Sequence, residues 1–171
     1  MSYENIPVNK HTRLIQLQPD QAGRLFELTE NNREHLAEFL PWPKFVKTAD
    51  DSRKHIEETL EKRDQNITYT YGIEYEGEII GDISLRNLND TQKTPEIGYW
   101  IASDYAGKGL TTKSVRALTN LGLSSLGLNK IIIRANPQNG ASNKVAEKAG
   151  YVQIGIEIEH DRPLNIWSIE R

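Results

Sequence analysis

The chain contains no cysteine among its 171 residues. It can therefore form no disulfide, offers no thiolate nucleophile and cannot bind a metal through sulfur. No stretch approaches the run of about 20 apolar residues that a transmembrane helix requires. The first ten residues, MSYENIPVNK, also lack the apolar core of a signal peptide. These absences predict a soluble, cytoplasmic protein with no membrane partner.

Basic charge and histidine are scarce as well, which excludes two further classes of function. The net charge is −3 at pH 7, whereas sequence-independent nucleic-acid binding requires a basic surface. The four histidines, at positions 11, 35, 55 and 160, show no metal-ligand spacing. We therefore expect neither a nucleic-acid partner nor a metal. With 37% hydrophobic residues, residues 1–171 are expected to form a single domain around a substantial core.

Helical patterns follow a first strand in the N-terminal third of the chain. Alternation over residues 11–18 predicts the strand, and the apolar spacing after Pro19 predicts a helix. A second helical stretch, residues 32–40, ends at a Pro-Trp-Pro sequence that no helix continues through. Thr48 and Asp51 have the spacing of a capping box, so we expect a third helix to begin there.

The period then changes from that of a helix to that of a strand. Residues 69–75 and 79–85 alternate around a Glu-Gly turn and predict a hairpin, with Ile79 and Ile83 on the same face. The continuous apolar run at residues 130–134 predicts a central strand covered on both faces. We further expect strands at 96–101, 151–159 and 164–169, and helices at 108–124 and from 139 to a C′ glycine at 150. The predicted fold is a mixed α/β (α+β) sheet with helices on both faces.

A Gly-Lys-Gly sequence joins a predicted strand to a predicted helix, within EIGYWIASDYAGKGLTTKSV at residues 96–115. The first turn of a helix presents free N–H groups and the positive end of its dipole, which favours phosphates. Gly107 and Gly109 would let a phosphate approach those amides, and Lys108 and Lys113 add positive charge. The Walker A spacing is absent, and a Rossmann fingerprint would need glycine at Thr112. Taken alone, the two glycines are equally compatible with an ordinary turn.

The wider pattern resembles the GNAT superfamily of N-acetyltransferases, which transfer acetyl from acetyl-CoA to an amine. The motifs EIGYWIASDYAGKG and NGASNKVAEKAGY, together with HLAEFLPWPKF at residues 35–45, are most similar to the RimJ/RimL branch, which includes ribosomal-protein N-terminal acetyltransferases. The resemblance covers essentially the whole chain. It implies the GNAT acyl-CoA N-acyltransferase fold, a mixed and mostly antiparallel sheet, and acetyl-CoA as co-substrate. It also implies a homodimer.

The resemblance assigns the cofactor site. The glycine loop would hold the CoA pyrophosphate, and Asn139 would contact the CoA arm unless it serves only as a helix N-cap. A backbone N–H near Trp100 and Ile101 would bond the thioester carbonyl. Asp104 stands where relatives carry Gln or Arg, and we expect its carboxylate to point away from the pyrophosphate. The residues implied in cofactor binding are Trp100, Ile101, Gly107, Lys108, Gly109, Leu110, Thr111 and Asn139.

The catalytic assignments also follow from the resemblance. The tyrosine that usually protonates the leaving thiolate in this superfamily is replaced by Ala146, and Ser142 takes the place of the serine that serves instead in the RimJ/RimL branch. A serine in the first turn of a helix is also common for capping alone. The base is implied to be Glu96, with Asp161 as the second candidate, although a solvated surface role is the ordinary one for any carboxylate.

The expected function is transfer of acetyl to a primary amine, directly within a ternary complex, because the chain has no cysteine to carry the acyl group. The expected acceptor is a protein N-terminal α-amine, as on a ribosomal protein. Two alternatives stay open. The acceptor could be a small amine (a polyamine, an aminoglycoside or an amino acid), which a narrow acidic pocket would favour over an open groove. The protein could also bind acyl-CoA without turnover.

Overall fold

The sheet of this protein has eight strands in the order β1-β2-β3-β4-β5-β6-β8-β7. The computed structural model describes residues 3–171. Neighbouring strands are antiparallel except β5 and β6, which are parallel. The strands are β1 (Asn5–Pro7), β2 (Thr12–Ile15), β3 (Tyr69–Tyr75), β4 (Glu78–Arg86), β5 (Glu96–Ile101), β6 (Lys130–Ala135), β7 (Val152–Glu159) and β8 (Arg162–Glu170).

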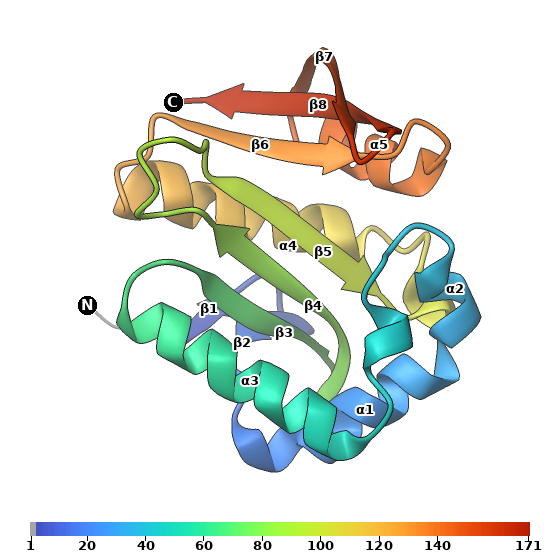
Figure 1. Ribbon diagram of the computed structural model, residues 1–171. Coiled ribbons are helices and arrows are strands. Elements are labelled where there is room, and N and C mark those ends of the chain that lie inside the picture. The colour runs from blue at the N-terminus through green and yellow to red at the C-terminus, as the bar shows by residue number, and fades with distance from the viewer. Residues whose placement is uncertain (1–2) are drawn as a thin grey trace.

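Helices cover both faces of the sheet, as predicted (Figure 1). α1 and α3 pack on one face beside β3 and β4, while α4 and α5 lie on the other face, α5 against β6, β7 and β8. The helices are α1 (Ala22–Asn31), α2 (Arg33–Ala37), α3 (Ala49–Asp64), α4 (Leu110–Asn120) and α5 (Gly140–Lys148), with short turns η1 (Pro19–Gln21), η2 (Pro43–Phe45), η3 (Ser103–Tyr105) and η4 (Leu121–Ser125).

The helix ends confirm several local predictions. Thr48 and Asp51 form the predicted capping box at the start of α3, because the Thr48 hydroxyl accepts from the Asp51 amide at 3.2 Å and the Asp51 carboxylate accepts from the Thr48 amide at 3.1 Å. Gly150 has φ +96° and ends α5 as expected. The helix predicted at 108–124 begins only at Leu110, because Gly109 stands outside it in the left-handed conformation.

The predicted hairpin of β3 and β4 is present, but the faces of β4 differ from the prediction. A register shift between Ile73 and Glu74 leaves one extra residue on β4. Ile79 therefore packs with α1 and α3, whereas Ile83 packs in the main core on the other side. The expectation that they share a face was wrong because a β-bulge reverses the alternation.

β6 is covered on one face rather than two. Ile131 and Ile133 are fully buried, but Ile132 between them is only half-buried. Helices α1 and α3 cover the sheet near β3 and β4 and do not extend over β6 (Figure 1). The prediction of burial on both faces was wrong because this layer of helices covers only half of the sheet.

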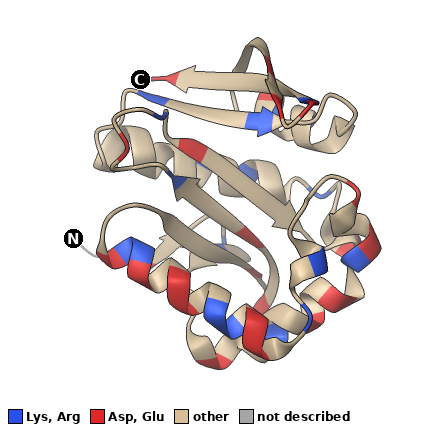
Figure 2. Ribbon diagram, viewed as in Figure 1, with Lys and Arg blue, Asp and Glu red and all other residues tan. Residues whose placement is uncertain are grey.

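The outer surface carries charges of both signs. Figure 2 shows them most clearly along the exposed side of α3, where acidic and basic residues alternate. Among residues 3–171, no helix is both long enough and apolar enough to cross a membrane.

Candidate active site

The parallel strands β5 and β6 pair at one position and then separate. Glu96 pairs with Ile132, whose amide donates to the Pro95 carbonyl at 2.9 Å. Beyond this pair the two strands diverge toward their carboxyl ends (Figure 1). A cavity of about 740 Å³ lies there, between the end of β5, the first turns of α4, the start of α5 and the segment around α2. Ligands of α/β sheets commonly bind at the carboxyl ends of strands, where a sheet opens in this way.

The backbone of β5 presents hydrogen-bond donors to this gap. The Ala102 amide donates to the Ile80 carbonyl at 2.8 Å on the opposite side, toward β4. Successive amides of a strand point in opposite directions. The amides of Tyr99 and Ile101 are therefore directed toward β6, which has already diverged. Trp100 and Ile101 both line the cavity.

The glycine loop leaves the start of α4 open. Gly107 and Gly109 both have φ +78°, a conformation that favours glycine, and a β-carbon added to either would meet no atom within 4 Å. Gly109 is the N-cap of α4 and supplies no side-chain hydrogen bond to the first turn. The free amides of that turn therefore face an open space, which is the geometry of an anion site. Of the cofactor residues predicted from sequence, those that line the cavity are Trp100, Ile101, Gly107, Gly109, Leu110, Thr111 and Asn139.

Lys108 is placed differently from the other predicted loop residues. Its ammonium lies 5.5 Å from the centre of the Tyr105 ring and Lys108 does not line the cavity. Positive charge comes instead from four other lining side chains, those of Lys113, Arg116, Lys144 and Lys148. Asp104 is exposed and outside the cavity lining, as its expected orientation requires. The cavity thus combines bare helix amides with several cations, a set of groups suited to phosphates.

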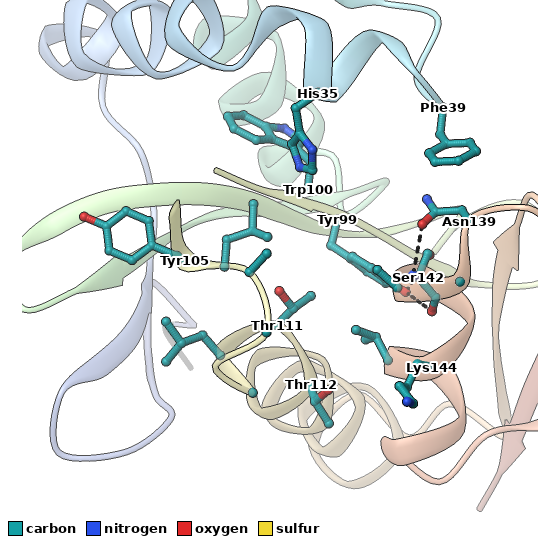
Figure 3. A pocket seen from close by; sticks show the side chains of 18 of the residues that line it. His35, Phe39, Tyr99, Trp100, Tyr105, Thr111, Thr112, Asn139, Ser142 and Lys144 are labelled. Carbon is teal, nitrogen blue, oxygen red and sulfur yellow. Dashed lines mark hydrogen bonds between the residues drawn. The ribbon is translucent and has the colours of Figure 1, made fainter. Parts of the chain in front are cut away.

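Ser142 is held at the start of α5 from two sides. Its amide donates to the Asn139 side chain at 3.1 Å, so Asn139 is the N-cap of the helix. The Tyr99 hydroxyl, reaching across from β5, lies 3.0 Å from both the carbonyl oxygen and the hydroxyl of Ser142. Figure 3 shows these three side chains meeting at one wall of the cavity. Burial raises the pKa of Tyr99 to about 12, against the opposing hydrogen bond to Ser142, so Tyr99 remains a proton donor at neutral pH.

Two neighbours of Ser142 on α5 lie outside the cavity lining. Ala146, at the position of the missing tyrosine, is fully buried in the main core. Asn143 is fully engaged, because its amide group donates to the Asn136 and Asn139 carbonyls and its oxygen accepts from Asn165 and Trp167. The start of α5 is thereby fixed to the turn before it and to β8.

Glu96 is buried in an ion-pair network and does not line the cavity. One carboxylate oxygen accepts from Arg86 on β4 and the other from Arg134 on β6, both at 3.0 Å. Its side chain is only 8% exposed. Geometry thus gives Glu96 a role in joining three strands, and its assignment as the base stays a prediction.

Asp161, the second candidate base, lies in the turn between β7 and β8. It is exposed, has φ +63° and lines neither this cavity nor the smaller one beside it. Glu38, near α2, is the one carboxylate among the described residues that line the main cavity. Sequence reasoning did not select Glu38, because it has no distinguishing spacing. The Tyr99 contact was also missed, since no local pattern links residues 43 positions apart.

A second cavity of about 150 Å³ adjoins the first one. Five residues line both: Phe39, Leu40, Tyr99, Asn139 and Ser142. Ser142 therefore stands where the two spaces meet. An arrangement of this kind can hold two ligands at once, one on each side of the serine, and can bring their reacting groups together.

The split sheet and the open phosphate site are those of an enzyme that uses an acyl-CoA. Residues 11–152 match the family model of the acetyltransferase (GNAT) domain, and the chain belongs to this family of N-acetyltransferases. The chain is 34% identical over 149 residues to YdaF of Bacillus subtilis, whose name marks it as a candidate ribosomal N-acetyltransferase, with 86% of this chain and 81% of YdaF covered. It is 29% identical over 152 residues to the ribosomal-protein-serine acetyltransferase of Escherichia coli, with 89% and 85% covered.

A solved structure has the same fold. It is the microcin C7 self-immunity acetyltransferase MccE in complex with acetyl-CoA and AMP. The TM-score is 0.90 at 25% identity, over 99% of this chain and 98% of that one. The family and fold predicted from the sequence are confirmed, and the protein is a GNAT-type acetyl-CoA-dependent N-acetyltransferase.

Proposed function

We propose that this enzyme acetylates the α-amine of a polypeptide N-terminus, of the ribosomal-protein type, by direct transfer from acetyl-CoA in a ternary complex. The observation that carries the proposal is the pair of adjoining cavities that share Ser142. Two substrates bound on either side of this residue need no covalent enzyme intermediate. The relatives named for ribosomal acetyltransferases support the choice of acceptor.

The main cavity fits the co-substrate. The bare first turn of α4 and the cations Lys113, Arg116, Lys144 and Lys148 would hold its phosphates. Gly107 and Gly109 leave open the space that side chains would fill. When bound, acetyl-CoA supplies the acetyl group as a thioester, with the CoA thiolate as leaving group.

The chain's own groups would act on either side of that thioester. The β5 amides directed into the gap, of which Ile101 lines the cavity, would donate to the carbonyl oxygen as it becomes negative. The Ser142 hydroxyl would donate a proton to the departing sulfur. Tyr99 would position that hydroxyl by its own hydrogen bond. Ser142 is thus proposed as the acid, and Tyr99 as the residue that orients it.

The acceptor amine must be neutral before it attacks. An α-amine with a pKa of about 7.8 costs about 1 kcal/mol to deprotonate at pH 7, whereas a lysine at about 10.4 costs roughly 4.6 kcal/mol. Water can therefore take the proton of an α-amine without a strong base. Glu96 and Asp161 remain proposals for this step, although neither lines the described cavities.

Binding of acetyl-CoA is tested by thermal unfolding. A ligand present at 100 times its dissociation constant adds about 2.7 kcal/mol, which raises the melting temperature by about 5–10 °C for a chain of this size. The shift should disappear in Gly109→Glu, which places a carboxylate at the phosphate site. Gly23→Glu is the matched control, because Gly23 is exposed on α1 and an added side chain meets nothing within 4 Å. No shift in the parent protein would contradict the proposal.

A measurement of turnover distinguishes an acetyltransferase from a protein that only binds acyl-CoA. A lysine-free peptide with a free serine N-terminus should be acetylated once, as measured by mass spectrometry. The same peptide with a blocked N-terminus should remain unmodified. Acetylation of spermidine but not of the free peptide would favour the small-amine alternative. A thermal shift without acetylation of any amine would favour binding without catalysis.

A further inference from the structure

The smaller cavity is lined by cations and by no acid. Three arginines line it, Arg86 from β4, Arg134 from β6 and Arg162 from β8. Among the described residues that line this space there is no aspartate and no glutamate. Its volume of about 150 Å³ corresponds to about five water molecules at roughly 30 Å³ each. The space is therefore small, and three guanidinium groups belong to its lining.

Two of these arginines are already paired. Glu96 accepts from Arg86 and from Arg134, and Arg134 also lies 3.5 Å from Glu157 and 3.7 Å from Glu159 on β7. These acids lie outside the cavity lining. The buried Glu96 holds the two guanidinium groups in place, and the three acids together offset the positive charge of both arginines.

Arg162 differs from both. It is exposed at the first position of β8, and it forms no ion pair within the described part of the chain. Its guanidinium therefore keeps its full hydrogen-bonding capacity for a ligand in the cavity. A planar guanidinium with five donors is best matched by a carboxylate or a phosphate.

The position of Arg86 depends on the absence of a side chain at Gly98 on β5. A β-carbon at residue 98 would collide with the Arg86 guanidinium. Any larger residue there would displace Arg86 from its place across β5, beside the cavity that Gly98 also lines. The guanidinium lining of the cavity thus depends on a glycine as well as on the arginines.

We infer that the small cavity selects an acceptor with an anionic group next to its amine, and that Arg162 binds this group. This inference rests on the proposed transfer to a polypeptide α-amine and names its substrate class, an N-terminus with an acidic residue at the second position. The unpaired charge of Arg162 also disfavours a polyamine, because an ammonium group in the cavity would face a cation that no acid offsets. The same unpaired charge favours the neutral form of a bound α-amine, which is the form that attacks.

The test compares three lysine-free peptides that begin Ser-Asp, Ser-Asn and Ser-Arg and are otherwise identical. With acetyl-CoA saturating and at low salt, kcat/KM should fall from Asp to Asn to Arg, by about three- to fivefold at each step. The differences should shrink at 1 M salt, where the screening length is about 3 Å. Equal rates, or a preference for Ser-Arg, would overturn the inference.

Arg162→Gln identifies the residue responsible. This variant should reduce the Asp-to-Arg ratio of kcat/KM to about threefold or less. Lys10→Gln is the matched control, because it removes one exposed positive charge from the loop between β1 and β2, away from both cavities. Its ratio should equal that of the parent protein. A ratio unchanged in Arg162→Gln would show that Arg162 does not make the selection.

Measurements of peptide binding distinguish a failure of this inference from a failure of the proposed function. If no peptide is acetylated, the proposed function fails, and calorimetry of the same three peptides against the CoA-saturated protein then decides. Tighter binding of Ser-Asp than of Ser-Arg, lost in Arg162→Gln, would support charge selection even without turnover. Equal affinities, or no binding of any peptide, would overturn it.

Discussion

Ser142 is a residue whose surroundings determine what it can do. Its amide is bonded to Asn139 and its hydroxyl contacts Tyr99, so the side chain is held at the junction of the two cavities. Capping does not require the contact between the Ser142 hydroxyl and Tyr99, because the N-cap of α5 is Asn139. The roles of Ser142 and Tyr99 can therefore be distinguished by substituting each residue in turn.

Ser142→Ala should lower kcat by about 10²-fold, because the departing thiolate then loses a positioned proton donor. The rate is measured at saturating acetyl-CoA, so that weaker binding does not contribute. Ser125→Ala, at an exposed serine of η4, is the matched control and should keep the parent rate. Full turnover in Ser142→Ala would remove Ser142 as the acid.

Tyr99→Phe should lower kcat by about tenfold, less than Ser142→Ala, because Ser142 remains but is no longer oriented. The thermal shift with acetyl-CoA should be unchanged, since the Tyr99 hydroxyl contacts Ser142 rather than the phosphate site. In a double variant the two losses should not add, because both act on one proton donor. Additive losses would show that Tyr99 acts independently of Ser142.

Single residues were predicted from sequence only where the signal was local. Asn139 and Thr48 were identified because a cap lies within a few residues of the amide that it serves. The Tyr99–Ser142 contact joins a strand to a distant helix, and Glu96 is paired with arginines 10 and 38 positions away. Such pairs depend on the sheet order, which no single residue reveals.

At the scale of elements, α3 is joined to the sheet by a titratable pair. His55 on α3 lies with its Nε2 atom 3.5 Å from a carboxylate oxygen of Asp82 on β4, and Asp82 is buried. The neighbouring Asp82 carboxylate raises the pKa of His55, against a smaller opposing effect of burial. This pair is a pH-dependent contact between a helix and the sheet.

The contribution of His55 to stability should decrease as pH rises. Because its pKa is higher in the folded than in the unfolded chain, the contribution is complete below the unfolded value of about 6.5 and is lost as pH passes through the folded value. Urea unfolding of the parent and of His55→Gln should therefore differ more at pH 5.5 than at pH 8.5. A difference that is constant with pH, or larger at pH 8.5, would contradict this.

Most elements could be predicted from period and capping, and the errors have physical causes. β1 was not predicted because three residues are too few to show alternation. The bulge in β4 was missed because an inserted residue leaves the apolar composition unchanged. β8 begins two residues earlier than predicted, since the turn before it uses His160 and Asp161, both with positive φ.

For the molecule as a whole, Glu96 joins the two halves of the sheet. β5 and β6 are paired at a single position, and the Glu96 carboxylate connects β4 and β6 across it. Removal of one member of a buried ion pair leaves the others uncompensated. The halves of the sheet thus depend on this carboxylate beside the gap.

Glu96→Gln should lower the free energy of unfolding by about 2–4 kcal/mol, as measured by urea titration. If Glu96 only joins the strands, the rate per folded molecule should stay within about threefold of the parent, because Glu96 lies outside both cavities. Asp161→Asn, at an exposed turn, is the comparison and should change stability by less than about 0.5 kcal/mol. A loss of about 10²-fold in kcat with unchanged stability would instead establish Glu96 as the base.

The divergence of β5 and β6 also has a kinetic consequence for the backbone. The amides of Tyr99 and Ile101 face a gap where an intact sheet would give them strand partners. In the free enzyme they should exchange their hydrogens with solvent much faster than the Ala102 amide, which is bonded to Ile80. Saturation with acetyl-CoA should slow the exchange of Ile101 toward that of Ala102. The rate of amide exchange where β5 has no strand partner would then report whether the cofactor is bound.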